Sequence, residues 1–494
     1  MNTSQQWHAK AAKLSIETRV FIDGKYVDAA SGETFACVNP ASGEIIAQVA
    51  SCGQADVDKA VNIARECFES GVWSHKSPVA RKQVLIRFAE LILQNSEELA
   101  LLETLDMGKP IGESLAVDVA GAARCINWCG EVVDKIYDEV APTSRDTIGL
   151  ITREAIGVVA AIVPWNFPLL MASWKLGPAL ATGNSIILKP SEKSPLSAIR
   201  LAAIALEAGI PAGVFQVLPG FGPEVGTPLA LHMDIDCIAF TGSTGVGKKL
   251  LEYSGQSNMK RVFAECGGKS PNIVFADCPD MDTAAKAAAG AIFYNQGEVC
   301  TAGSRLLVEA SIKDEFVEKV IAASKFMQPA DPLDPDSFMG AIVDEGQMDR
   351  VLGFIDDGKC NAKLIHGGNR VRQESGGYYI EPTIFDEVDE ECRIFHEEIF
   401  GPVLSVITFE TMEEAIRLAN NSEYGLAAAV WTRDISKAHK TAKALRSGSV
   451  WINTWDGGDM TMPFGGFKQS GNGRDKSIHA LEKYTELKST WIVL

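Results

Sequence analysis

Short apolar runs alternate with segments of helical periodicity through the middle of this chain. The apolar runs lie at 158–163, 186–188, 215–218, 237–240 and 273–275. The helical segments between them lie at 169–182, 197–208 and 247–253. A strand that is buried on both faces reads as a continuous apolar run, and its alternation with helices is typical of a parallel sheet covered on both sides. We therefore predict an α/β fold with a doubly wound parallel sheet over residues 148–280.

Residues 281–460 repeat this alternation and predict a second doubly wound α/β domain. Its helices are expected at 284–293, 313–325 and 412–420, and its strands at 305–308, 403–409 and 450–453. Upstream, residues 55–139 are expected to be helical, because apolar residues in 57–67 and 81–98 recur at spacings of three and four.

Two strand-like segments fall outside both sheets. They cover residues 147–153 and 485–494, and the second ends on Trp491-Ile492-Val493-Leu494. A terminal apolar strand needs a partner for its free edge. We expect each of the two segments to pair across a subunit interface.

Length and composition narrow the class of protein. The 494 residues exceed a single ordinary core, so two or three domains are expected. The net charge of −18 disfavours a nucleic-acid partner, because phosphate binding needs a basic face. No apolar run reaches the roughly 18 residues of a membrane span, and no apolar leader opens the chain. The eleven scattered cysteines are typical of reduced thiols, so we expect a cytoplasmic protein.

One cysteine stands apart from the others in its surroundings. Cys300 follows Asn295-Gln296-Gly297-Glu298-Val299 rather than ordinary core sequence, and a carboxylate, Glu265, precedes two glycines earlier in the chain. A thiolate attacks a carbonyl carbon when a base has taken its proton, and a carboxylate can be that base. In a chain that also carries nucleotide-binding turns, this pair predicts covalent redox chemistry on a carbonyl compound.

Three turns at strand ends predict a dinucleotide site. The glycines of 220–226 are similar to a dinucleotide fingerprint with one additional residue, although a purely structural turn is the alternative. Residues 242–249 come close to a P-loop, but Lys249 replaces the hydroxyl that would hold magnesium, which disfavours an NTPase. Lys189 and Glu192 can bind an adenosine ribose, and Glu192 would repel a 2′-phosphate, which favours NAD over NADP. A solvated Lys–Glu pair is the alternative.

These features belong to a longer series of motifs. The series runs in order over nearly the whole chain: Pro164-Trp165-Asn166-Phe167-Pro168, Leu188-Lys189-Pro190-Ser191-Glu192, Phe240-Thr241-Gly242-Ser243-Thr244, Glu265-x-Gly267-Gly268-Lys269, Gly297-x-x-Cys300, Glu398-Ile399-Phe400-Gly401-Pro402, Asn453 and Pro463-Phe464-Gly465-Gly466. The series resembles the aldehyde dehydrogenase superfamily. Residues 456–461 and 481–488 are similar to the branch that oxidises ω-amino, γ-glutamylamino and guanidino aldehydes in polyamine breakdown.

The resemblance implies a subunit of three parts. These are a Rossmann-like NAD-binding domain (1–132 and 156–267), a catalytic domain (268–468) and a small β oligomerisation arm (133–155 and 469–494). It also implies NAD as cofactor, with NADP left open, and a homotetramer or homodimer. No metal is expected, since His396-Glu397-Glu398-Ile399 is not a zinc-binding His-Glu-x-x-His motif.

The resemblance also assigns the chemistry. Cys300 is the expected nucleophile, Glu265 the general base, and the Asn166 amide with the Cys300 N–H the oxyanion hole. Addition to the aldehyde gives a thiohemiacetal, oxidation leaves a thioester, and Glu265 activates the water that hydrolyses it. CoA-acylating relatives generally lack this base, so Glu265 favours hydrolysis to the acid.

The expected cofactor contacts follow from the same motifs. Glu398 would hold the nicotinamide ribose, Phe400 would lie beside the ring, and Lys189 and Glu192 would hold the adenosine ribose. The other expected cofactor residues are Ile162, Pro164, Trp165, Ser191, Gly222, Gly226, Phe240, Thr241, Gly242, Ser243 and Cys266. The family usually has Leu where this chain has Cys266, so this thiol is either a neutral packing substitution or a site of oxidation.

A substrate tunnel is expected beside Cys300. Its residues are Phe167, Met171, Trp174, Val299, Thr301, Trp455 and Phe464, each with core packing as the alternative. Gly458 would widen the tunnel, and Asp456, Asp459 and Asp118 would place negative charge near its mouth for a cationic aldehyde. The alternative for each aspartate is a solvated carboxylate.

Other functions stay open at this point. A broad-specificity aliphatic or betaine aldehyde dehydrogenase carries the same core motifs. A thiol esterase built on Cys300 would need a histidine base, and none lies in a comparable motif. A non-catalytic protein of this fold is disfavoured, because Cys300, Glu265 and Asn166 are all present.

Overall fold

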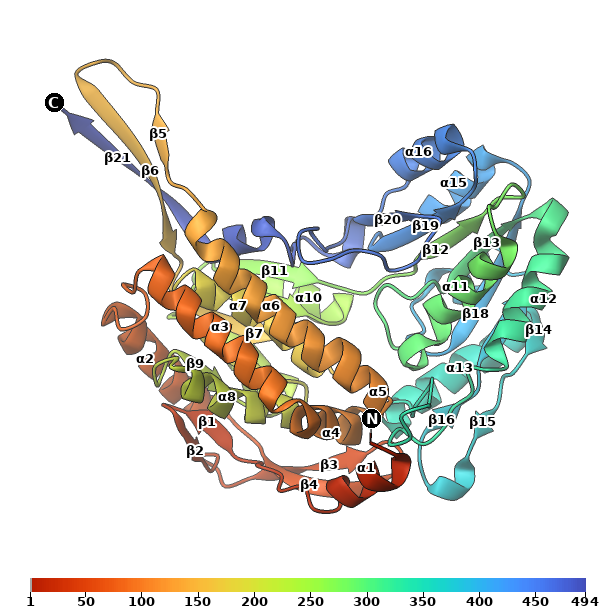
Figure 1. Cartoon of the computed structure of the whole chain (residues 1–494), viewed down its shortest axis with the longest axis horizontal. Coiled ribbons are helices and arrows are strands. Elements are labelled where there is room, and N and C mark those ends of the chain that lie inside the picture. Colours follow the sequence, from red (N-terminus) through yellow and green to blue (C-terminus); the bar gives the residue numbers. More distant parts are fainter. Residues whose placement is uncertain (1) are drawn as a thin grey trace.

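The computed structural model describes residues 2–494, which form two α/β lobes and a projecting arm (Figure 1). The sheet of the first lobe has seven strands in the order β11-β10-β7-β8-β9-β1-β2. Their bounds are β11 (Arg261–Glu265), β10 (Cys237–Thr241), β7 (Val158–Ile162), β8 (Ser185–Lys189), β9 (Phe215–Val217), β1 (Val20–Ile22) and β2 (Lys25–Val27). The five strands from β11 to β9 are parallel, and β1 and β2 add an antiparallel edge.

Both faces of this sheet are covered, which explains the continuous apolar runs. Val159 and Ala161 of β7 pack in one core, and the alternate residues Val158 and Ala160 pack in another. Successive side chains of a strand point to opposite faces, so a strand between two helical layers must be apolar at every position. One layer holds α3 (Pro78–Gln94), α4 (Ser96–Met107), α6 (Ala120–Val132), α7 (Pro168–Ala181) and α8 (Leu196–Ala208), and the other holds α2 (Gln54–Glu69), α9 (Thr227–Leu231) and α10 (Thr244–Gln256).

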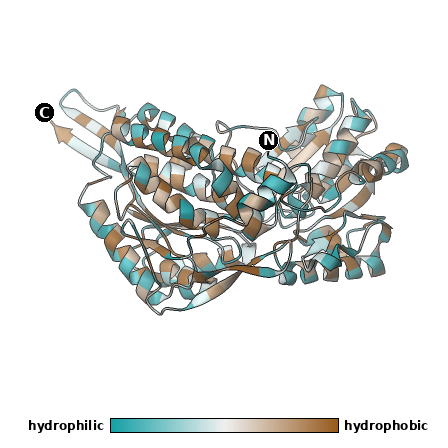
Figure 2. Ribbon diagram, turned by 60° about the horizontal axis from the view of Figure 1, so that its bottom comes forward, coloured by the Kyte–Doolittle hydropathy of each residue, from teal (hydrophilic) through white to brown (hydrophobic). Residues whose placement is uncertain are grey.

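The second lobe repeats the design with seven strands in the order β14-β17-β18-β13-β12-β19-β20. The bounds are β14 (Lys363–His366), β17 (Thr383–Asp386), β18 (Val403–Phe409), β13 (Arg305–Glu309), β12 (Pro271–Val274), β19 (Ala427–Trp431) and β20 (Ser449–Ile452). Ile273 packs towards α13 (Glu345–Asn361) and α15 (Met412–Asn420), and Val274 packs towards α11 (Met281–Phe293) and α12 (Lys313–Ser324). Figure 2 shows hydrophobic and hydrophilic residues alternating along the covering helices. The predicted α/β class with two doubly wound sheets is confirmed.

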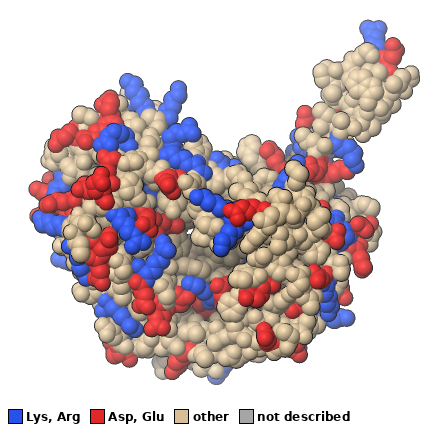
Figure 3. Space-filling model, turned by 180° about the vertical axis from the view of Figure 1, so that it is seen from behind, with Lys and Arg blue, Asp and Glu red and all other residues tan. Residues whose placement is uncertain are grey.

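The arm corrects one prediction. The segments expected to pair across a subunit interface pair with each other: β21 (Thr485–Val493) runs antiparallel to β6 (Thr147–Ala155) over nine residue pairs. A third strand, β5 (Glu139–Ala141), joins the other edge of β6. The arm projects from the body, and the chain ends at its tip (Figures 1 and 3). All residues of β21 after Thr485 are exposed, so its faces and its outer edge remain uncovered.

Two further details differ from the sequence expectation. The helix expected over 81–98 is two helices, because the backbone turns out of helical geometry at Asn95, whose Nδ2 donates to the Leu91 carbonyl. The N-terminal strands, including the hairpin of β3 (Thr34–Asn39) and β4 (Glu44–Ala50), were not predicted, because they are short and only partly buried. Within residues 2–494, no helix is both long and apolar enough to cross a membrane.

Candidate active site

A strained turn presents Cys300. Asn295, Gln296 and Gly297 all have left-handed backbones, with φ of 48°, 58° and 73°. Two non-glycine residues in this region cost energy, and such strain persists only where the surroundings hold it. Here the side chain of Gln296 accepts from the Gly340 N–H at 2.8 Å, and a Cβ on Gly297 would lie 2.2 Å from the Gly401 carbonyl oxygen. The turn therefore fixes the backbone that leads to the thiol.

Asn166 is held against this turn. Its Nδ2 donates to the Glu298 carbonyl at 2.8 Å, and Asn295 Nδ2 donates back to the Asn166 carbonyl at 3.2 Å. The amide of Asn166 is buried. One of its two N–H groups is used in fixing the side chain, and the other is left to bind an oxyanion.

The thiol of Cys300 is poorly solvated and has negatively charged side chains nearby. Burial raises the pKa of Cys300, and the charges of Glu398, Asp456 and Glu265 raise it further. A buried thiol with a raised pKa is a poor nucleophile until a base removes its proton. Cys300 therefore needs a proton acceptor within the site.

Glu265 is such an acceptor. It ends β11, it is buried, and neither of its carboxylate oxygens has a hydrogen-bond partner among residues 2–494. A Cβ on Gly465 or Gly473 would lie 2.8 or 2.9 Å from Oε1 of Glu265, so these glycines make room for the carboxylate. Burial raises the pKa of Glu265 well above its usual range, and the charge of Asp475 adds to this. A carboxylate with a raised pKa is a stronger base.

A buried ion cluster lies behind Glu265. Lys175 of α7 and Lys483 both bind the carboxylate of Asp475, and all three side chains are buried. The two ammonium groups hold the pKa of Asp475 below its ordinary value, although burial acts the other way. The same two positive charges lower the pKa of Glu265 and so partly offset the rise that burial causes.

A second carboxylate faces the first lobe across the interlobe boundary. Glu398 Oε1 accepts the Gly268 N–H at 2.9 Å, and a Cβ on Gly267 would lie 2.1 Å from Oε2. Burial raises the pKa of Glu398 to about 7. Two residues on, Phe400 has a left-handed backbone and packs edge-on against Trp165, with ring centres 5.2 Å apart.

The first lobe has the shape of a dinucleotide cradle. A Cβ on Gly222 or Gly245 would meet no other atom within 4 Å, and both residues are exposed, so these backbones are open to an approaching ligand, whereas Gly226 is buried. Ser243 caps the N-terminus of α10, where the N–H groups and the helix dipole favour a phosphate. At the end of β8, Lys189 Nζ lies 3.3 Å from Oε2 of Glu192. These features fit a dinucleotide that spans from Glu192 to Glu398.

The remaining expected cofactor residues border this cradle. Ile162 and Thr241 are the last residues of β7 and β10, and Pro164 follows β7. Ser191 accepts the Lys193 N–H, and the ring of Phe240 lies against Gly242. Cys266 is buried, its sulfur would lie 2.9 Å from a Cβ on Gly247, and burial raises its pKa to about 12. Burial and weak acidity favour packing over oxidation for this thiol.

Aromatic residues converge beside Cys300. Phe167 stacks with Tyr294 at 6.3 Å between ring centres, and Trp174 meets Phe464 at 5.0 Å. The ring of Trp455 packs on Gly303 and on Trp451. Met171 and Thr301 are buried, and Val299 packs with both neighbouring cores. Apolar side chains of this kind would suit the carbon chain of an aldehyde.

The expected acidic residues divide into two groups. Asp456 is close enough to Cys300 and Tyr294 for its charge to raise the pKa of both, and Asp459 is exposed and accepts from Thr461. The sequence analysis placed Asp118 near the mouth of the tunnel, and the structure corrects this prediction. Its side chain is fully buried and pairs with Lys109 at 2.9 Å. The pair lies under Phe167, whose ring centre is 3.9 Å from Lys109 Nζ.

Sequence reasoning missed three residues of the site. Tyr294 and Glu113 interact through their side chains, and Lys476 lies 5.7 Å from the ring centre of Trp174. Tyr294 directly precedes the Asn295 turn, which was a usable signal. Nothing in the sequence near Lys476 or Glu113 indicated their position.

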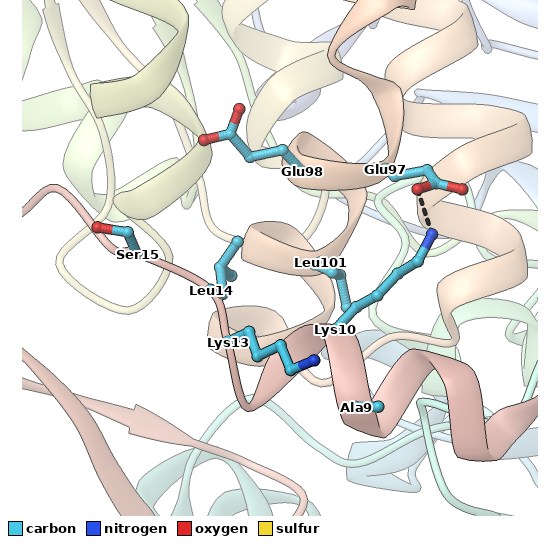
Figure 4. Close-up of a pocket in the computed structure, with 8 residues that line it drawn as sticks. All are labelled: Ala9, Lys10, Lys13, Leu14, Ser15, Glu97, Glu98 and Leu101. Atoms are coloured by element: carbon cyan, nitrogen blue, oxygen red, sulfur yellow. Dashed lines mark hydrogen bonds and ion pairs between the residues drawn. The ribbon is translucent and has the colours of Figure 1, made fainter.

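Two other features carry none of this chemistry. A shallow recess between α1 (Ser4–Ala11) and α4 is lined by residues such as Lys10, Leu14 and Leu101, with an ion pair between Lys10 and Glu97 (Figure 4). None of the expected site residues lies in it. Within residues 2–494, no group of three or more His, Cys, Asp or Glu side chains is arranged to hold a metal ion.

The fold and this site define an aldehyde dehydrogenase. A sequence profile of the Aldehyde dehydrogenase family matches residues 26–490, and the chain belongs to this family. It is an enzyme that oxidises an aldehyde with NAD(P). It is 56% identical over 488 residues to the NADP/NAD-dependent aldehyde dehydrogenase PuuC of Escherichia coli (strain K12), covering 99% of this chain and 98% of that protein.

Two solved structures superpose over their whole length. One is the P. syringae indole-3-acetaldehyde dehydrogenase AldA, a Cys-to-Ala mutant in complex with NAD+ and IAA, at 63% identity and a TM-score of 0.99. The other is the gamma-glutamyl-gamma-aminobutyraldehyde dehydrogenase of Burkholderia cenocepacia J2315, at 61% identity and a TM-score of 0.99. Each alignment covers 100% of both chains.

Proposed function

We propose that this enzyme oxidises an ω-amino, γ-glutamylamino or guanidino aldehyde to the carboxylic acid, through a thioester on Cys300. The observation that supports the proposal is that the site combines three groups suited to this chemistry. These are a thiol on a strained turn, the fixed amide of Asn166, and the unpartnered carboxylate of Glu265.

Each group has one task. Glu265, directly or through water, takes the proton of Cys300, and the sulfur forms a bond to the aldehyde carbon. The Asn166 N–H stabilises the negative charge that appears on the carbonyl oxygen. NAD, when bound, supplies the oxidant that removes a hydride from that carbon. Glu265 passes the Cys300 proton to solvent and, as a carboxylate again, takes a proton from water; the hydroxide attacks the thioester, the acid leaves, and the proton on Glu265 returns to the Cys300 sulfur.

The residues of the cradle would hold the cofactor. Lys189 and Glu192 would bind the adenosine ribose, the turn around Gly222 and Ser243 the phosphates, and Glu398 the nicotinamide ribose. The half-exposed carboxylate of Glu192, at the end of β8, would repel a 2′-phosphate and supports NAD as the preferred cofactor, with NADP as a second one.

The choice of substrate rests on charge near the far end of the tunnel. The charges of Asp456 and Glu113 act on Tyr294, those of Asp456 and Asp459 act on Lys476, and the Burkholderia relative is named a γ-glutamyl-γ-aminobutyraldehyde dehydrogenase. A cationic group is attracted to such a mouth, whereas the end of an alkyl chain is not.

A substrate panel tests the proposal. The kcat/KM values of 3-aminopropanal, 4-aminobutanal, γ-glutamylaminobutanal, 4-guanidinobutanal and hexanal are compared at fixed NAD. The kcat/KM of at least one charged aldehyde is expected to exceed that of hexanal about tenfold, which is the effect of one charge-assisted hydrogen bond. Equal or better use of hexanal would overturn the substrate assignment, and turnover by Cys300→Ala would overturn the mechanism.

The proposal extends to organisation and assembly. Residues 1–132 and 156–267 would form the NAD-binding domain, 268–468 the catalytic domain, and 133–155 with 469–494 the oligomerisation arm. The exposed faces of β21, with Leu487 and Trp491 each 66% exposed, support a homotetramer or homodimer built through the arm. The eleven free cysteines support a cytoplasmic location.

A further inference from the structure

The loop that carries Lys476 is bonded to Phe464, one of the residues expected to line the substrate tunnel. Phe464 and Asp475 exchange two backbone hydrogen bonds, of 2.8 and 2.7 Å, and the Ser477 N–H donates to the Met460 carbonyl at 2.8 Å. The segment is thus tied at one side to the aromatic wall and at the other to the end of the acidic loop 456–459. Lys476 stands between these two ties.

The backbone of this lysine is strained. Lys476 and Ser477 have φ of 59° and 52°, a region that side chains other than glycine rarely adopt. Two adjacent residues in this conformation are strained, and such strain is concentrated at ligand sites. The strain turns the stem of Lys476 over Trp174, 5.7 Å from the ring centre, rather than into solvent.

The ammonium of Lys476 is half-buried and has no hydrogen bond or ion pair within residues 2–494. Burial lowers its pKa, and the charges of Asp456 and Asp459 oppose this effect. Asp456 also makes no hydrogen bond through its side chain in the part of the chain that the structure describes. Lys476 and Asp456 are therefore near enough to influence each other's charge but do not form an ion pair. We call the region around these two side chains the mouth.

We propose that this mouth recognises a dipolar tail, with Lys476 binding a carboxylate of the substrate and Asp456 and Asp459 binding its ammonium group. The inference rests on the proposed function and narrows it to one of the three aldehyde classes. A γ-glutamylamino aldehyde carries an α-ammonium and an α-carboxylate at its far end. A simple ω-amino or guanidino aldehyde carries a cation alone, which Lys476 repels.

The test combines substrate analogues with substitution of the lysine. The wild-type enzyme is assayed with γ-glutamylaminobutanal, with its α-carboxamide analogue, with 4-guanidinobutanal and with hexanal. Loss of the substrate carboxylate is expected to lower kcat/KM about tenfold, as for one charge-assisted contact. In Lys476→Met, replacing the substrate carboxylate by a carboxamide is expected to leave kcat/KM unchanged. The ratio of kcat/KM for 4-guanidinobutanal to that for hexanal is expected to rise.

Controls separate this role from a structural one. Lys476→Arg keeps the charge and should keep the dipolar preference, and Lys440→Met, at an exposed position on α16 (Ile435–Ala444), should leave every substrate ratio as in the wild type. If the carboxamide analogue is used as well as the parent aldehyde by the wild type, or if Lys476→Met lowers all aldehydes equally, the inference fails. If the wild type oxidises no charged aldehyde better than hexanal, the proposed substrate class itself fails.

Discussion

The backbone N–H of Gly268 donates to Oε1 of Glu398 at 2.9 Å, which joins the segment after Glu265 to the carboxylate that faces the cofactor cradle. Burial raises the pKa of Glu398 to about 7, so near neutral pH this group is divided between its acid and its anion. The anion accepts stronger, charge-assisted hydrogen bonds from the hydroxyls of a ribose than the neutral acid does.

The first prediction concerns pH and NAD. Because the pKa of Glu398 is raised to about 7, the anion predominates above pH 7 and is lost progressively as the pH falls through 7. The KM for NAD is therefore expected to rise below pH 7, by about tenfold per pH unit at the acid end. Steady-state kinetics from pH 5.5 to 8.5 measure this. In Glu398→Gln the KM should be high and nearly constant, and an unchanged pH profile in this variant would contradict the assignment.

The second prediction concerns Asn166. Removal of one oxyanion donor costs about 100- to 1,000-fold in kcat, so Asn166→Ala should lose activity by this factor. The turn around Cys300 keeps its other hydrogen bonds, including that from Gln296 to Ala341, so the thiol should still react with iodoacetamide. Loss of alkylation together with activity would instead show that Asn166 acts by holding the turn.

The third prediction concerns the buried pair of Lys109 and Asp118. Lys109→Met leaves the carboxylate buried and unpaired, with Glu103 also 3.9 Å from the lost ammonium, and should lower the free energy of unfolding by about 3–5 kcal/mol. The matched control is Lys359→Met, which breaks an exposed pair with Asp356 and should cost less than about 1 kcal/mol. Urea midpoints compare the two, and equal shifts would refute a structural role for the buried pair.

The fourth prediction concerns the arm. Trp491→Glu places a charge on a strand whose faces are uncovered, and the particle mass in solution should fall. Phe326→Glu is the control, because Phe326 is 88% exposed and lies outside the arm. Light scattering after gel filtration gives both masses. An unchanged mass for Trp491→Glu would remove the arm from the assembly interface.

The predictable parts of the fold are those with local signals. The bounds of β18 and α15 agree with the sequence expectation, because one is a continuous apolar run and the other begins at a Thr411 cap. The pairing of β21 with β6 was not foreseen, although both strands were. A strand's partner is set by contacts distant in sequence, which periodicity does not report.

The candidate site divides in the same way. The motifs around Cys300, Asn166 and Glu265 mark themselves by glycines and by unusual composition. Asp118 was misplaced because it lies in a π-helical segment, η1 (Ser114–Val119), and its partner Lys109 precedes that segment. Lys476 was missed because its position depends on a backbone with positive φ and on a contact with Trp174, which is distant from it in the sequence.

The most direct test of the account is to trap the thioester. Glu265→Gln removes the base that serves both steps, so with aldehyde and NAD the acylation of Cys300 should be slow, and the acyl group should then persist because no base activates water. Mass spectrometry of the Cys300 peptide from this variant should show the aldehyde's mass less two hydrogens, with NADH released in no more than one equivalent per site. An unmodified Cys300 with continued NADH release, or an acyl group on another cysteine, would contradict the account.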